Sequence, residues 1–374
     1  MSVMVSLRSI AVLGCVFALL STGATASAQV GRRPNLDPFR PTADTEGFLT
    51  LPGATTPGHL LGGAGVFLDY TYESLVTIDP SGASRQIDHR LSARFAGVLG
   101  LFRWGALHLD VPLVLANRGP SIDAGDVSRA GMSDPRLSAR ARVAGRRSEV
   151  PGVTPVGAGL AFELGSTIPV GSSRAFASEN QPTFDLLAHL DYYFAPGAGL
   201  SLSLGWLFRP NDRMIFDERF DDAFLFGVGM RLPIPMVPNL TVKLEVRGSS
   251  TFTSVLTTPV EGEIGVAYGV GPVTIHGYFG TGFTDGAGAP LARAMLGLVV
   301  SRKTKDQDGD GIPDAVDKCP LLPEDFDGFE DDDGCEDPDN DGDFIMDDED
   351  LCPDEAPPEG TDLDEDGCID DEFR

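Results

Sequence analysis

Residues 240–247, LTVKLEVR, alternate strictly between aliphatic and polar side chains. Every even position is aliphatic, and the odd positions include Lys243, Glu245 and Arg247. Because successive side chains of a strand point to opposite faces, this stretch predicts a strand with one aliphatic and one charged face. The same period of two recurs in LSLSLGW (residues 200–206), at residues 66–72 and at residues 136–143.

The alternation divides the middle of the chain into about twelve segments of roughly ten residues each. They lie near 59–73, 85–97, 102–115, 135–145, 156–169, 183–194, 199–209, 221–232, 238–248, 259–270, 272–284 and 291–302. Alternating segments of this length, separated by turns, are typical of a transmembrane β-barrel. A soluble β-sandwich also alternates and is the other fold to consider.

The joins between the segments favour the barrel. Short joins occur near 98–101, 195–198, 233–237 and 271, and longer joins near 74–84, 116–134, 170–182, 210–220, 249–258 and 285–290. Only the join near 146–155 is long where a short one is expected. Outer-membrane barrels alternate short turns with long loops and have an even number of strands. We therefore expect an all-β fold, an antiparallel transmembrane β-barrel of about 12 strands at 59–302, surrounded by outer-membrane lipid.

Charged residues in the middle of strands suit the wet lumen of a barrel better than the core of a sandwich. The residues predicted to face the lumen are Arg90, Arg94, His108, Asp110, Arg136, Arg140, Arg142, Glu163, Lys243, Glu245, Arg247, Glu261 and Glu263. Because both signs are present, they could form a salt-bridge network that fills a narrow barrel, or they could line a charged pore. We favour a packed or narrow lumen.

The first 28 residues are predicted to be a secretory signal peptide. Arg8 precedes the apolar run IAVLGCVFALL (residues 10–20), and Ala26-Ser27-Ala28 fits a cleavage site. A lipoprotein cleavage box at residues 12–15 is the weaker alternative, because it shortens the apolar run. Residues 29–58 would form an N-terminal extension, and no later stretch is apolar enough for a membrane helix.

The net charge of −28 is concentrated at one end of the chain. Residues 306–374 contain 31 of the 56 acidic residues and 2 of the 28 basic residues, so the rest of the chain is nearly neutral. Such a tail repels nucleic acid and attracts divalent cations. No GxSxG, phosphate-loop or HExxH motif is present, so we expect no catalytic residues and no enzymatic activity.

The acidic tail repeats every 33 residues, with DQDGDGIPDAVDKCP at 306–320 and DNDGDFIMDDEDLCP at 339–353. Its acids follow the schedule of a calcium loop, with carboxylates at positions one, three and five and a carbonyl at position seven. The predicted ligands are Asp306, Asp308, Asp310, Ile312, Asp314 and Asp317 in the first unit, and Asp339, Asp341, Asp343, Ile345, Asp347 and Asp350 in the second. Further ligands are expected from Asp325, Asp327, Asp331, Asp333, Asp362, Asp364 and Asp366.

Two features separate these loops from an EF-hand. Position twelve is Asp rather than Glu, and no helix is expected on either side. In the second unit Phe344 replaces the turn glycine, so we expect a better-formed site in the first unit. The four cysteines of the tail are expected to form disulfides in an oxidising compartment, in any of three pairings: Cys319, Cys335, Cys352 and Cys368.

These residues resemble thrombospondin type 3 repeats over 306–374. In that family the chain wraps around calcium ions and is pinned by disulfides. A signal peptide, a barrel and such repeats together resemble large members of the outer-membrane protein A family, as does the strand-opening phrase GMSDPRLSARARV (131–143). Those proteins usually continue into a peptidoglycan-binding domain. Because this sequence stops at Arg374, the resemblance does not imply peptidoglycan binding.

We therefore expect a structural or interaction protein of the Gram-negative outer membrane, with a narrow pore at most and a calcium-stiffened stalk in the periplasm. Its expected partners are lipid, Ca²⁺ and other envelope proteins. Two alternatives are a secreted or surface calcium-binding adhesion protein on a soluble β-sandwich, and a selective porin.

Overall fold

The computed structural model describes residues 35, 40–44, 47–58, 60–79, 82–102, 104–119, 128–145, 156–211, 213–215, 218–301, 314, 317–324, 329–330, 333–347, 349–358, 360–363 and 366–369. The chain divides into a barrel unit and a tail unit, and the main part of the tail unit is Lys303–Arg374. Among the described residues, no helix is long and apolar enough to cross a membrane.

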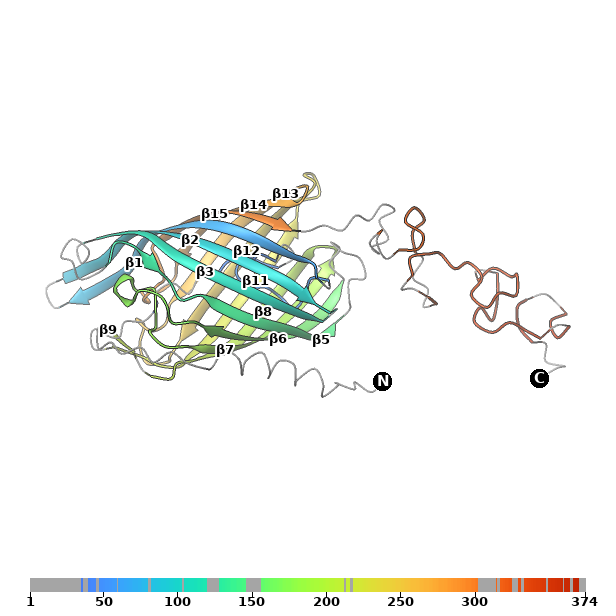
Figure 1. Cartoon of the computed structure of the whole chain (residues 1–374), viewed down its shortest axis with the longest axis horizontal. Coiled ribbons are helices and arrows are strands. Elements are labelled where there is room, and N and C mark those ends of the chain that lie inside the picture. Colours follow the sequence, from blue (N-terminus) through green and yellow to red (C-terminus); the bar gives the residue numbers. More distant parts are fainter. Residues whose placement is uncertain are drawn as a thin grey trace. The chain divides into compact units, whose positions relative to one another are not determined.

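Twelve strands of the described chain form a closed antiparallel barrel (Figure 1). They are β1 (Gly62–Asp79), β2 (Gly82–Leu101), β3 (Gly105–Arg118), β5 (Arg136–Gly145), β6 (Gly157–Thr167), β7 (Phe184–Ala195), β8 (Ala198–Phe208), β11 (Ala223–Pro233), β12 (Leu240–Ser250), β13 (Val260–Val270), β14 (Val273–Gly282) and β15 (Ala292–Ser301). Each strand pairs with the next one in this series. The barrel closes where β1 pairs with β15, from Gly63 opposite Ser301 to Tyr72 opposite Ala292. This closed wall confirms the predicted all-β barrel and rules out the sandwich.

The short elements lie outside the series of barrel strands. They are β4 (Gly131–Met132), which pairs with β3, the hairpin of β9 (Arg213–Ile215) and β10 (Glu218–Phe220), and one turn of 3-10 helix, η1 (Ser173–Ala175).

The two faces of each strand differ as the alternation predicts. On β1, Phe67 and Asp69 are at most 1% exposed. Their neighbours Val66 and Leu68 point to the other face and are 43% and 48% exposed. All thirteen charged residues predicted for the lumen lie on the inner face: eleven are buried, and His108 and Arg142 are half-buried. An aliphatic outer wall and a charged interior are the arrangement that lipid outside and polar groups inside require.

The two rims of the barrel differ in the length of the joins between strands. The rim with the short joins is called the turn rim, and the rim with the long joins the loop rim. At the turn rim lie the two-residue turns 196–197 and 271–272, where Gly197 and Gly271 take positive φ angles of 71° and 57°. The loop rim carries the long joins at 119–135, 168–183, 209–222, 251–259 and 283–291. Both the start of β1 and the end of β15 lie at the turn rim. The predicted exception at 146–155 lies outside the described residues.

One predicted loop is wrong, and one predicted short join is displaced, because residues 98–101 belong to β2 and β3 begins at Gly105. Residues 74–84 were expected to join two segments, but β1 runs to Asp79 and β2 begins at Gly82, so the hairpin extends beyond its neighbours (Figure 1). The pairing shifts register between Tyr72 and Val76. Such a bulge breaks the period of two and hides the continuation of the strand in the sequence.

Candidate functional sites: the barrel lumen and an acidic turn

An ion-pair network crosses four strands of the inner wall. On β15, Arg293 contacts Asp69 of β1 at 2.7 Å and Glu261 of β13 at 2.6 Å. Arg247 of β12 contacts Glu261 at 2.9 Å and Glu263 at 3.1 Å. These side chains are almost fully buried, so each charge depends on its partners instead of water.

A second group of charges lies on β5, β6 and β7. The guanidinium of Arg136 contacts Glu163 at 2.8 Å and also pairs with Asp185. His189 lies 3.6 Å from the second oxygen of Glu163. The predicted salt-bridge network is therefore present on the inner wall, as a packed lumen requires.

The described part of the N-terminal extension at residues 40–44 and 47–58 lies inside the barrel and is called the luminal segment below. Phe48 and Leu49 are at most 1% exposed. Glu245 accepts hydrogen bonds from the N–H groups of Leu49, Thr50 and Leu51 at 3.0–3.2 Å. The lumen is thus partly filled by a part of the chain that has no alternating pattern.

A cavity of about 170 Å³ remains between the luminal segment and the wall. It extends from Pro259 and Gly288 near the loop rim to His108 and Glu163 on the inner wall. Residues 41–43 and 50–52 of the luminal segment also line it. The luminal segment therefore leaves part of the lumen unfilled.

Several inner-wall residues were missed by the sequence analysis. Asp69, Asp185, His189, Asp191 and Arg293 are all at most 2% exposed and face the lumen. Each lies on an inner position of its strand, so the same period of two could have identified them. The luminal segment itself had no such signal.

The described part of the tail unit contains two similar loops, each closed by a disulfide. Cys319 pairs with Cys335, and Cys352 pairs with Cys368, each across 16 residues. In both loops an Asp two residues before the first cysteine accepts that cysteine's N–H, at 2.7 Å for Asp317 and 2.6 Å for Asp350. The 33-residue repeat of the sequence is thus also a repeat of local structure.

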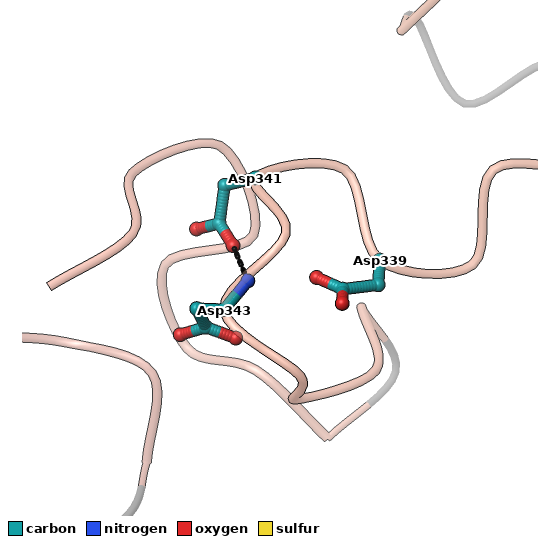
Figure 2. Close-up of side chains that lie close together, drawn as sticks. All are labelled: Asp339, Asp341 and Asp343. Atoms are coloured by element: carbon teal, nitrogen blue, oxygen red, sulfur yellow. Dashed lines mark hydrogen bonds between the residues drawn. The ribbon is translucent and has the colours of Figure 1, made fainter.

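Three predicted ligands of the second unit converge in one turn. Figure 2 shows Asp339, Asp341 and Asp343 around it, and one carboxylate oxygen from each lies within 4.8 Å of the others. The turn is shaped by its own acids: Asp339 accepts the N–H groups of Gly342 and Phe344, and Asp341 accepts that of Asp343. The carboxylates of Asp339 and Asp341 are therefore held against the main chain of the turn.

Two further acids complete this acidic turn. Asp347 accepts the N–H of Asn340 at 3.0 Å, which holds it against the turn. Asp350 is 8% exposed. It lies close enough to Asp341 for its negative charge to raise the pKa of Asp341. Desolvation raises the pKa of Asp341, and the negative charges of Asp343, Asp350 and Asp339 raise it further. The hydrogen bond from the N–H of Asp343 lowers this pKa and offsets part of the rise. Asp341, Asp343, Asp347 and Asp350 each keep one buried oxygen without a hydrogen-bond partner in the described chain.

The remaining predicted ligands are only partly described. Asp333 and Asp366 accept the N–H groups of Cys335 and Cys368, and Asp362 accepts that of Gly367. A hydrogen bond from the exposed Lys318 ammonium lowers the pKa of Asp333. Outside the described residues lie Asp306, Asp308, Asp310, Ile312, Asp325, Asp327, Asp331 and Asp364. The expectation that the first site is better formed than the second concerns these residues and stays a prediction.

The fold belongs to the class of twelve-stranded transmembrane β-barrels. The chain is similar to an outer membrane channel from Pseudomonas putida F1, with 11% identity and a TM-score of 0.50 over 67% of this chain and 98% of the other. KdgM porin in complex with disordered oligogalacturonate is 7% identical, with a TM-score of 0.40 over 64% of this chain and 99% of the porin. NanC porin is also 7% identical, with a TM-score of 0.41 over 65% of this chain and 99% of the porin. No protein-family model matches this chain. No curated protein has a significantly similar sequence.

Proposed function

We propose that this chain is an outer-membrane β-barrel protein whose tail binds calcium. The observation that carries the calcium proposal is the acidic turn, where carboxylate oxygens of Asp339, Asp341 and Asp343 converge. In the described chain, Asp341, Asp343, Asp347 and Asp350 also each keep one buried oxygen without a hydrogen-bond partner. Buried carboxylates without partners are costly, and a divalent cation would compensate them. Calcium is preferred because it takes about 6–8 oxygen ligands from a flexible loop.

The proposed shell of the second unit consists of five carboxylates and one main-chain carbonyl: Asp339, Asp341, Asp343, Ile345 (carbonyl), Asp347 and Asp350. The first unit would bind a second ion in the same way, since Asp317 and Asp350 have the same hydrogen bond to the following cysteine. This arrangement agrees with the resemblance to thrombospondin type 3 repeats. Bound calcium would stiffen the tail by cancelling the mutual repulsion of its acids.

The difference between the two rims supports a periplasmic position for the tail. In outer-membrane barrels short turns face the periplasm and long loops face outward. Since β15 ends at the turn rim, the tail would extend from the barrel into the periplasm. A structural or interaction role in the cell envelope then fits a filled barrel with an attached calcium-binding stalk.

A porin-like role is the second candidate, favoured by the cavity that extends from the loop rim into the lumen. A surface adhesion protein on a soluble sandwich is no longer a candidate, because the sheet is closed.

The membrane part of the proposal is tested by gel migration of the detergent-extracted protein before and after heating. A closed barrel resists detergent until it is boiled, so the unheated band should migrate differently from the heated band. A protein found only in the soluble fraction, with no such shift, would refute the assignment.

The calcium part is tested by titrating Ca²⁺ into the detergent-solubilised full chain with isothermal calorimetry. We expect binding near 10⁻⁴–10⁻³ M, the range of extracellular calcium modules. Asp343→Asn should weaken the binding attributed to the second unit about tenfold, because one charged ligand is lost. Asp354→Asn removes an exposed acid outside the turn and should change nothing. Equal weakening in both variants would mean that only total charge matters.

A further inference from the structure

We propose that the luminal segment is a plug that keeps the barrel closed and whose withdrawal opens an ion-conducting path. This inference rests on the proposed function as an outer-membrane barrel and goes beyond it. The argument starts from the way in which the wall holds the segment.

One strand of the wall binds the main chain of the segment with two opposite charges. Glu245 of β12 accepts three consecutive N–H groups, those of residues 49–51. Lys243, two residues earlier on the same face, donates to the carbonyls of Gly47 and Phe48, both at 2.8 Å. Because these contacts are made to the main chain, they hold the segment largely regardless of its side chains.

The opposite wall holds the segment as well. Arg140 of β5 donates to the carbonyl of Gly53 at 3.0 Å and to the carboxylate of Asp44 at 2.8 Å. Asp191 of β7 accepts the N–H of Ala54 at 2.6 Å. The segment is thus bound from β5, β7 and β12, and it bridges the lumen between them.

Glycines in the wall make space for the segment. A Cβ added at Gly227 would lie 2.8 Å from Leu51, and one added at Gly229 would lie 2.9 Å from Phe48. Without the segment, these glycines of β11 would leave a recess in the wall that faces the lumen. The inner surface is therefore shaped for an occupant, and the occupant is residues 47–54 of the same chain.

The segment is well placed to obstruct the lumen and is anchored to the wall at one end. The cavity reaches inward from the loop rim and is bounded in part by residues 41–43 and 50–52. The segment joins the wall covalently only through the start of β1, and its other contacts are hydrogen bonds, ion pairs and packing. Such contacts can break and reform, whereas strand pairs of a closed barrel cannot separate without opening the wall.

Conductance in planar lipid bilayers tests the inference by comparing three variants with the intact chain. A deletion of residues 40–56 should raise the mean conductance severalfold over the intact chain. Glu245→Gln should raise the open fraction, because three N–H groups lose a charged acceptor. Glu263→Gln is the matched control, since Glu263 is the cross-strand partner of Glu245 but pairs with Arg247.

A disulfide lock supplies a test that does not depend on the deletion. A Cβ at Gly159 would lie 3.2 Å from the Cβ of Ala54, close to the spacing of a disulfide. The pair Ala54→Cys and Gly159→Cys should abolish openings when oxidised, and dithiothreitol should restore them. The intact chain with dithiothreitol controls for reduction of the two tail disulfides.

Two results would overturn the inference. One is a folded deletion variant, shown by its heat-dependent gel shift, that conducts no more than the intact chain. The other is an oxidised lock that opens as often as the intact chain. Either result leaves the membrane barrel and the calcium tail standing, because these are tested by gel migration and calorimetry. A chain without a heat-dependent shift would instead remove the proposed function itself.

Discussion

At the scale of single residues, side chains with similar sequence signals have different surroundings in the folded chain. Lys243, Glu245 and Arg247 follow one another on the inner face of β12. The first two bind the main chain of the luminal segment, whereas Arg247 pairs with Glu261 and Glu263 of the wall. The alternation predicts that all three face inward, but the partner of each depends on contacts with distant residues.

Phe344 gives a prediction at this scale. It takes a left-handed φ of 78° and is 93% exposed, so its ring contributes little packing. A left-handed conformation costs an L-residue about 1–2 kcal/mol, which glycine avoids. We expect Phe344→Gly to tighten calcium binding of the second unit severalfold, as measured by calorimetry. Gly342→Ala, at φ 76°, should act in the opposite direction. Weaker binding by Phe344→Gly would contradict this explanation.

At the scale of elements, the inner faces of the strands are joined by buried ion pairs. Arg293 links β15 to β1 and β13 and is 2% exposed. Its loss would leave Asp69 and Glu261 with fewer cationic partners in a site with little water. Pairs of this kind are expensive to break from one side, although they add little as intact pairs.

Arg293→Met should therefore lower the free energy of unfolding by about 3 kcal/mol. Urea unfolding in detergent micelles, followed by tryptophan fluorescence, measures the change. Arg219→Met is the control: its contact with Asp221 at 3.5 Å is exposed, and we expect a loss below about 1 kcal/mol. Similar losses in the two variants would show that the lumen is as well hydrated as the surface.

At the scale of the whole barrel unit, described residues on the two sides of the luminal segment contact opposite rims of the barrel. The N–H of Asn35 donates to Glu179, in the join between β6 and β7 at the loop rim, at 3.3 Å. Leu60 donates to the carbonyl of Gly100 at the turn rim. Chain segments on the two sides of the luminal segment therefore reach opposite rims.

This path predicts the accessibility of Asn35 in cells. If the loop rim faces outward, a membrane-impermeant maleimide added to intact cells should label Asn35→Cys. Asp354→Cys in the tail should be labelled only after the outer membrane is permeabilised. The opposite pattern would invert the proposed orientation of the barrel.

The amino-acid sequence by itself determined the positions of the twelve wall strands and the direction of their charged side chains. It did so because a strand has a period of two, and because lipid and lumen demand opposite chemistry on its two faces. The bulge in β1 limited this prediction, since an extra residue shifts the period. The 33-residue repeat and the acidic turn were likewise evident from local spacing.

Only the tertiary structure decided the closure of β1 against β15, the pairing of the four cysteines and the occupation of the lumen. These features join residues far apart in the chain, and in Glu245 and Leu49 the separation is 196 residues. Local periodicity carries no information about such contacts. Residues 47–54 have no alternation because they belong to no strand, and their position depends on a wall built from the strands that follow.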